Sequence, residues 1–80
     1  MNKIQDNRKQ RLIGKYCREY RERKKLKIND IRGDINYQTI NSFEKGSSSN
    51  IHILSIYLKI AKENRELNRF MEKIGEILCN

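Results

Sequence analysis

Proline and tryptophan are absent from this chain of 80 residues, which contains only one histidine and two cysteines. His52 and the distant Cys17 and Cys79 cannot form a zinc site of known ligand spacing. Two thiols in a chain without a signal peptide do not suggest a disulfide scaffold, and they favour a reducing cytoplasm. We therefore predict no metal and no cofactor. Cys17 is expected in the core of a helix, and His52 at the surface or near a helix cap.

Other absences limit the class of function. The chain has no glycine loop of the kind that cradles phosphates and no set of nucleophile, base and acid, so we do not expect an enzyme. A single domain of this length leaves no room for a cleft between two lobes. No apolar run approaches the ~18 residues of a membrane span, and the N-terminus lacks the apolar core of a secretory signal. We expect no membrane partner.

Basic residues are plentiful and unevenly placed. Lys and Arg number 18 against 10 Asp and Glu, which gives a formal net charge of +8. Residues 1–27 hold eleven bases and three acids, whereas residues 28–80 hold seven of each, so the whole excess lies in the first third. Such a block usually faces a polyanion. The alternative is a solvated helix face that serves solubility.

Apolar residues recur at helical spacing, and strand-like alternation is hard to find. The pattern predicts helices over residues 12–24, 28–33, 37–45, 51–62 and 63–78, after a basic, flexible arm at residues 1–11. Short helices with tight connections predict an all-α orthogonal bundle of five helices.

Glycine and short polar residues predict where these helices end and begin. Gly33 is expected to end the second helix in the left-handed conformation, and Gly46 to end the third. Asn36 is a suitable N-cap for the third helix, and Ser49 or Asn50 for the fourth.

Residues 13–46 carry an ordered set of weak signals with consistent spacing: Ile13-Gly14, Arg18 and Arg21, Leu26, then Ile40, Phe43, Glu44 and Gly46. This set resembles the Xre-type (lambda-repressor-like) helix-turn-helix family. The turn between the second and third helices is about two residues short, as in the Rgg-type subset. Ile28 or Asn29 replaces the usual Gln, and Arg32 replaces the usual Ala of the second helix.

The resemblance implies a DNA-binding helix-turn-helix domain at residues 12–62, with a recognition helix at about 37–45. Such a helix lies in the major groove, where base edges display a full donor and acceptor code. The residues implied or expected to contact bases are Tyr37, Gln38, Asn41 and Ser42. Those expected to contact phosphates are Lys27, Asn29, Asn36, Lys45, Ser47 and Ser48.

Two further features follow from the resemblance. Arg21 and Glu44 match positions that form a structural ion pair. The C-terminal helix, within residues 63–80, matches one that often forms a dimer. Its expected dimer contacts are Leu67, Phe70, Met71, Ile74, Ile77 and Leu78, although simple packing against the rest of the chain is the alternative.

Together these patterns predict a sequence-specific transcriptional regulator: a small bacterial or phage repressor that binds double-stranded DNA as a homodimer in the nucleoid-containing cytoplasm. One observation favours a different use of the fold. Residues 28–50 hold only Arg32 and Lys45 against Asp30, Asp34 and Glu44, which is little positive charge for a DNA-binding face. The alternative is a protein-binding module, such as an antirepressor or a phage inhibitor of a host nucleic-acid-binding protein.

Overall fold

The computed structural model describes residues 3–79, with side chains from Arg8 onward. It consists of five helices: α1 (Lys3–Arg23), α2 (Ile28–Ile31), α3 (Tyr37–Glu44), α4 (Ile51–Glu63) and α5 (Leu67–Cys79). The described residues contain no strand, so the predicted all-α class is confirmed. None of these helices combines the length and the apolar character that a membrane span requires.

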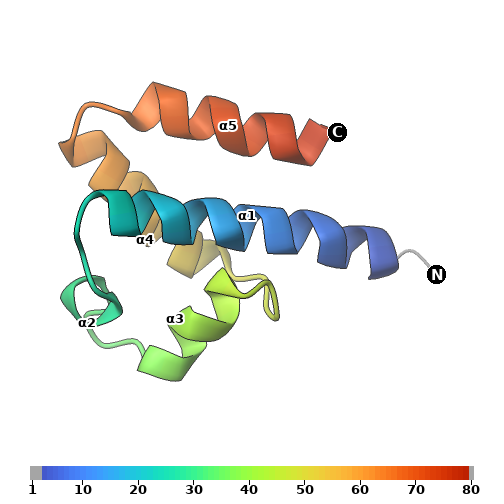
Figure 1. Ribbon diagram of the computed structural model, residues 1–80, viewed down its shortest axis with the longest axis horizontal. Coiled ribbons are helices and arrows are strands. Elements are labelled where there is room, and N and C mark those ends of the chain that lie inside the picture. The colour runs from blue at the N-terminus through green and yellow to red at the C-terminus, as the bar shows by residue number, and fades with distance from the viewer. Residues whose placement is uncertain (1–2, 80) are drawn as a thin grey trace.

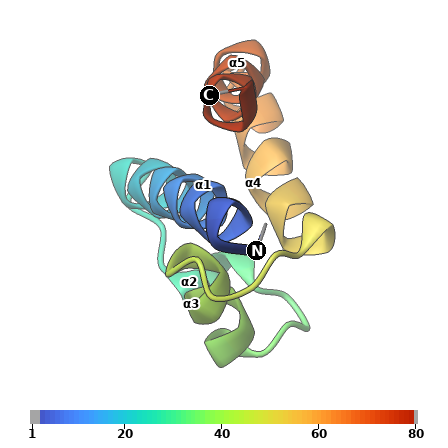
Figure 2. The same ribbon diagram turned by 90° about the vertical axis from the view of Figure 1, so that its right-hand side faces the viewer.

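The long helices surround one core. In Figure 1, α1 and α5 run side by side across the molecule, with α4 crossing behind α1, and with α2 and α3 below α1. Figure 2 looks almost along α1 and α5, and shows α4 linking the α5 end of the molecule to the α2–α3 end. α4 contacts both α1 and α5, and α3 contacts both α1 and α2. This arrangement leaves one side of α3 without a covering helix.

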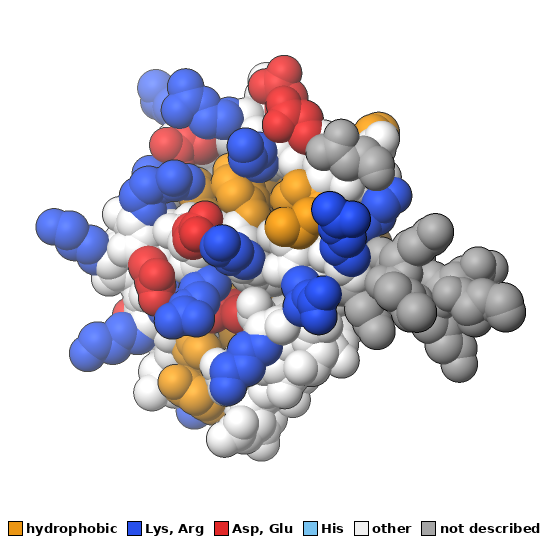
Figure 3. Space-filling view, turned by 45° about the vertical axis from the view of Figure 1, so that its right-hand side comes forward, with side chains coloured by type: hydrophobic (Ala, Val, Ile, Leu, Met, Phe, Trp, Pro, Cys, Tyr) orange, Lys and Arg blue, Asp and Glu red, His pale blue; other side chains and the backbone are white. Residues whose placement is uncertain are grey.

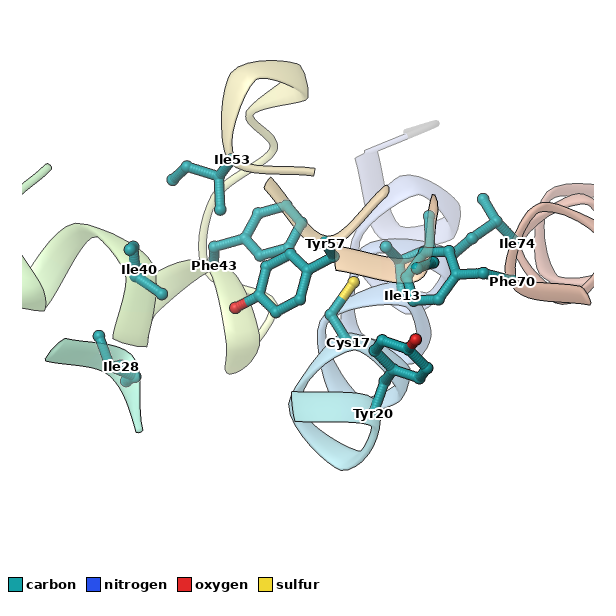
Figure 4. Close-up of a cluster of buried hydrophobic side chains, with 11 residues drawn as sticks. Ile13, Cys17, Tyr20, Ile28, Ile40, Phe43, Ile53, Tyr57, Phe70 and Ile74 are labelled. Atoms are coloured by element: carbon teal, nitrogen blue, oxygen red, sulfur yellow. The ribbon is translucent and has the colours of Figure 1, made fainter. Parts of the chain in front are cut away.

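Residues from all five helices form the core (Figure 4). The rings of Tyr16 and Tyr20 lie 5.0 and 5.1 Å, centroid to centroid, from the ring of Phe70, which joins α1 to α5. The rings of Phe43 and Tyr57 stack at 6.0 Å and join α3 to α4. The α5 helix is therefore part of the same core as the segment that resembles a helix-turn-helix.

The N-terminal segment differs from the prediction. Instead of a flexible arm through residue 11, helix α1 begins at Lys3, while residues 1–2 lie outside the described part. The early turns of α1 are held by partners that a local pattern does not reveal. Lys9 Nζ donates a hydrogen bond of 2.7 Å to the carbonyl oxygen of Leu78, and Arg11 lies directly against Gly46.

Several helix ends match the prediction. Gly33 and Gly46 adopt positive φ angles of 56° and 82°, and Asn36 and Asn50 cap α3 and α4 with their side chains. The break between α4 and α5 does not match, because α5 begins at Leu67 rather than at residue 63. There Arg65 adopts φ 61°, and the backbone N–H of Glu66 donates a hydrogen bond to the carbonyl oxygen of Ala61. Glycine is the usual residue at a helix end of this kind.

Gly14 lies where α1 and α3 approach each other most closely. A Cβ added there would lie 2.7 Å from the carbonyl oxygen of Glu44 and closer still to that of Phe43, and both atoms belong to the backbone. We expect Gly14→Ala to lower the free energy of unfolding by ~1–3 kcal/mol, because the two helices must move apart. Urea denaturation followed by circular dichroism measures this change.

Gly75 provides the matched control within α5. A Cβ added at this position meets no atom within 4 Å. Gly75→Ala is therefore expected to raise the free energy of unfolding by about 0.5–1 kcal/mol, through the better helix propensity of alanine. Effects of the same sign and size in the two variants would contradict the close approach at Gly14.

Candidate nucleic-acid interface

The first turn of α3 is fixed by its cap. The Oδ1 atom of Asn36 accepts a hydrogen bond of 2.7 Å from the backbone N–H of Gln38. Asn36 adopts an extended backbone conformation, and Tyr37 and Gln38 follow it as the first helical residues. Because Asn36 uses this oxygen as a cap, the structure gives it a role in starting α3, in addition to the phosphate contact predicted from the sequence.

The two sides of α3 differ sharply in character. Ile40, Phe43 and Glu44 are buried on the inner side. Outside, Tyr37 is 45% exposed, and Gln38 and Thr39 are exposed as well. The other two predicted base-contacting residues, Asn41 and Ser42, are half-buried. The sequence prediction omitted Thr39, although its position in the first turn of an eight-residue helix could have indicated it.

A buried ion pair holds the last turn of α3. The guanidinium of Arg21 donates to both carboxylate oxygens of Glu44, from Nε at 2.8 Å and from Nη2 at 2.9 Å. Arg21 also donates from Nη1 to the carbonyl oxygen of Leu26 at 2.9 Å, and the hydroxyl of Tyr57 donates to Glu44. Glu44 thus connects α1, α3 and α4, and these contacts hold α3 in one orientation. The expected pair of Arg21 and Glu44 is present.

Burial and charge around this network alter the ionisation of its members. The hydrogen bonds that Arg21 donates to Glu44 raise the pKa of Arg21. Burial, followed by the hydrogen bond to Glu44, raises the pKa of Tyr57. Burial raises the pKa of Cys17 to about 12, and the nearby negative charge of Glu44 acts in the same direction. Cys17 is therefore a protonated core residue at neutral pH rather than a nucleophile.

The helix before α3 presents Lys27 and Asn29 to solvent. Asn29 Oδ1 accepts a hydrogen bond of 2.8 Å from Nε of Arg32, and Nη1 of Arg32 donates to the carbonyl oxygen of Ile35 at 3.0 Å. Arg32 therefore supports the turn between α2 and α3 from a position where the resembling family usually has alanine. Of the two predicted phosphate donors on this side, Lys27 is the one that carries a charge.

The turn after α3 passes close to α1. Lys45 and Ser47 are exposed and Ser48 is half-buried. A Cβ added to Gly46 would lie 2.5 Å from Cα of Arg11, so the turn and α1 are in backbone contact. The turn that carries Lys45, Ser47 and Ser48 therefore lies against Arg11 through Gly46, whereas the sequence predicts that Arg11 belongs to a flexible arm.

Charge is distributed unequally between α1 and α3. Figure 3 shows blue Lys and Arg side chains spread across the upper and middle parts of one face, whereas the lower part, over α3, is mostly white. The exposed acids Asp30 and Asp34 lie near the start of α3. The outer side of α3 is therefore polar and uncharged, and the positive charge of the protein lies mainly elsewhere.

The structure corrects part of the dimer prediction for α5. Phe70 and Ile74 are 1% and 8% exposed and lie in the core of the chain itself, because that side of α5 faces α1 and α4. Leu67 and Ile77 are half-buried against the same core. Met71 and Leu78, at 53% and 50% exposure, remain on the surface. Only these last two predicted dimer residues are largely available to a partner.

The remaining candidates for chemistry lie apart from one another. His52 is exposed at the start of α4, Cys17 is buried, and Cys79 is exposed. Within the described part of the chain, no group of three or more His, Cys, Asp or Glu residues is placed to hold a metal ion.

No protein-family model, curated protein sequence or solved structure matches the chain.

Proposed function

We propose that the protein is a sequence-specific regulator of transcription that inserts α3 into the major groove of double-stranded DNA. The observation that carries this proposal is the two-sided character of α3. Its inner side is held by the buried contacts of Glu44, while its outer side presents uncharged hydrogen-bonding groups. An α-helix with its side chains is ~10–12 Å across, which suits a groove about 12 Å wide. The resemblance of residues 13–46 to Xre-type proteins supports the same use.

The side chains of α3 have distinct proposed roles. Gln38 pairs with an adenine through its amide, and Tyr37 contacts a phosphate or a thymine methyl group. Asn41 and Ser42 contact neighbouring base edges as the helix sits deeper in the groove. Phosphate contacts on the two sides of the helix hold its register. They are made by Lys27, Asn29, Asn36, Lys45, Ser47 and Ser48. Backbone amides at the start of α4 add a positive dipole end.

A homodimer is part of this proposal. Two copies related by a twofold axis would place two α3 helices about one DNA turn apart, 34–36 Å, on a palindromic site. The exposed Met71 and Leu78 of α5 are the apolar side chains left for such an interface. The protein would then act as a repressor at the nucleoid, in the cytoplasm of a bacterium or during phage infection.

Selection from a random pool of duplex DNA tests the proposal directly. At both low and near-physiological salt, we expect an enriched palindromic motif. Gln38→Ala should then lose ~1–3 kcal/mol of discrimination at one base position of each half-site, with little change in affinity for unrelated DNA.

Asn68→Ala, an exposed amide on α5, is the matched control and should leave the motif unchanged. A Gln38→Ala variant that selects the same motif with the same strength would remove Gln38 from base recognition. Binding that occurs only at low salt and enriches no motif would contradict the regulator itself.

The low charge around α3 favours one second candidate, a protein-binding module on the same fold. In that case α3 contacts a protein, as in an antirepressor or an inhibitor of a nucleic-acid-binding protein. Absence of DNA retardation even at low salt, together with a stable complex with an acidic protein that Tyr37→Ala weakens, would select this candidate over DNA recognition.

A further inference from the structure

Four basic side chains form a stripe along the outside of α1: Arg8, Arg11, Lys15 and Arg18. We call them the α1 basic stripe. Their spacing of three, four and three residues places them on one side of the helix. All four are exposed. They span ~15 Å along the helix axis, with one positive charge about every 5 Å.

The fold leaves this stripe without strong partners. Among the side chains described from residue 8 onward, Arg8, Arg11 and Lys15 form no ion pair or side-chain hydrogen bond. Arg18 approaches Glu22 at 3.2 Å, but both side chains are more than half exposed, so the pair is weak.

Among the described side chains, other basic residues of α1 and of the turn that follows it have partners. Arg21 is paired with Glu44 in the interior, and Lys24, just after α1, forms a 2.7 Å ion pair with Glu66. Lys9 donates to the carbonyl oxygen of Leu78, and the guanidinium of Arg23 lies over the Tyr20 ring. Among the described basic side chains of α1, the residues of the stripe are therefore those that internal packing does not explain.

The stripe is continuous with the surface around α3. Gly14, between Arg11 and Lys15 in sequence, contacts the carbonyl groups at the end of α3. Arg11 lies against Gly46 in the turn that also carries Lys45 and Ser47. A phosphate backbone that follows this turn therefore reaches Arg11 first and then the rest of the stripe.

The physical character of the stripe favours a phosphate backbone over other anionic partners. A helix that binds a membrane surface inserts an apolar face, but the apolar face of α1, with Ile13, Cys17 and Tyr20, is buried in the core. Protein interfaces usually centre on buried aromatic anchors, and the stripe contains none. A regular row of exposed charges matches the regular charges of a nucleic-acid strand.

We propose that the α1 basic stripe is a sequence-independent site for the phosphate backbone of duplex DNA. It supplies most of the ionic part of binding, to which the phosphate contacts proposed beside α3 contribute only Lys27 and Lys45, while α3 distinguishes sequences. The choice of duplex DNA rests on the proposed function, but binding at the stripe does not require that α3 recognises any sequence.

Salt dependence on a duplex of arbitrary sequence tests this site. The triple variant R11Q/K15Q/R18Q is compared with K59Q/K62Q/R69Q, which removes the same charge from exposed residues of α4 and α5. Because the first variant no longer neutralises three phosphates, its slope of log K against log salt should fall by ~2.7. When the salt concentration rises from 50 to 200 mM, the fold-loss of affinity should therefore be ~40 times smaller for this variant than for the wild type. The second variant should keep the wild-type slope to within about one.

Two further variants distinguish loss of charge from loss of folding. R11K/K15R/R18K keeps every charge and should keep the wild-type slope. Lys15→Gln alone changes an exposed side chain without a partner and should lower the slope by ~0.9. Circular dichroism and thermal melting establish that each variant is folded before binding is compared.

The outcomes separate this inference from the proposed function. Equal slope losses in the two triple variants, or no loss in the first, would overturn the stripe even if the protein selects a DNA motif. A large loss confined to the first triple variant would support the stripe even if no motif is enriched. Stripe-dependent binding to single-stranded but not duplex nucleic acid would overturn the choice of duplex.

Discussion

Glu44→Gln is expected to lower the free energy of unfolding by ~3–5 kcal/mol, the cost of leaving a buried charge without its partner. Glu44 is 5% exposed and accepts two hydrogen bonds from Arg21 and one from Tyr57. Glutamine keeps the size of the side chain but removes the negative charge. Its amide N–H₂ also faces a donor, either Arg21 or Tyr57. The guanidinium of Arg21, which is 9% exposed, is then no longer neutralised.

Glu22→Gln is the control for this prediction. Glu22 forms an ion pair with Arg18 on the exposed side of α1. Loss of this pair should lower the free energy of unfolding by less than ~0.5 kcal/mol. Urea denaturation of both variants measures the difference. If Glu44→Gln costs no more than Glu22→Gln, the pair of Arg21 and Glu44 is not the buried connection described above.

A double variant isolates the contribution of the Arg21–Glu44 pair. Replacing both residues by apolar ones, as in R21M/E44L, removes the unpaired charge. It should be less destabilising than the sum of the two single replacements. If α3 binds DNA as proposed above, Glu44→Gln should weaken that binding as well, because Glu44 holds the end of α3 against α1 and α4.

Phe70→Ala is expected to lower the free energy of unfolding by ~3–5 kcal/mol, independently of protein concentration. Phe70 is 1% exposed, and its ring contacts those of Tyr16 and Tyr20 on α1. Truncation opens a cavity between α1 and α5 that cannot close without moving one of these helices. Thermal and urea unfolding over a hundredfold range of protein concentration measure both the size of the effect and its molecularity.

The neighbouring Met71 supplies the matched control. Its side chain is 53% exposed, so Met71→Ala should cost less than ~1 kcal/mol in the monomer. In a dimer formed through this surface, its effect would instead appear as a higher dissociation constant in sedimentation. A Phe70→Ala effect that vanishes at high protein concentration would place Phe70 between subunits and contradict the core described here.

The best sequence predictions are those whose cause is local. Gly33 and Gly46 end helices because the left-handed conformation is least costly for glycine. Asn36 and Asn50 begin helices because a short side-chain oxygen satisfies backbone amides that lack a helical partner. These effects act within a few residues, so the local sequence is sufficient to predict them.

The failed predictions concern effects that act between distant segments. Helix α1 starts at Lys3 rather than near residue 12, and its early turns contact Leu78 and Gly46, which lie far away in the sequence. The helix end at Arg65 was missed because a non-glycine residue adopts the left-handed conformation there. Both depend on contacts that the surrounding structure makes, which no pattern in the sequence displays.

The all-helical class, the main helices, several of their caps and the concentration of positive charge in residues 1–27 follow from the amino-acid sequence alone. The periodicity of α5 indicates which residues share a stripe, but the packing of α5 against α1 and α4 buries Phe70 and Ile74 and leaves Met71 and Leu78 exposed. Only the tertiary structure places Arg11 beside the turn after α3. The physical reason is that periodicity depends on the helix alone, whereas burial and the joining of charged surfaces depend on how neighbouring helices pack against it.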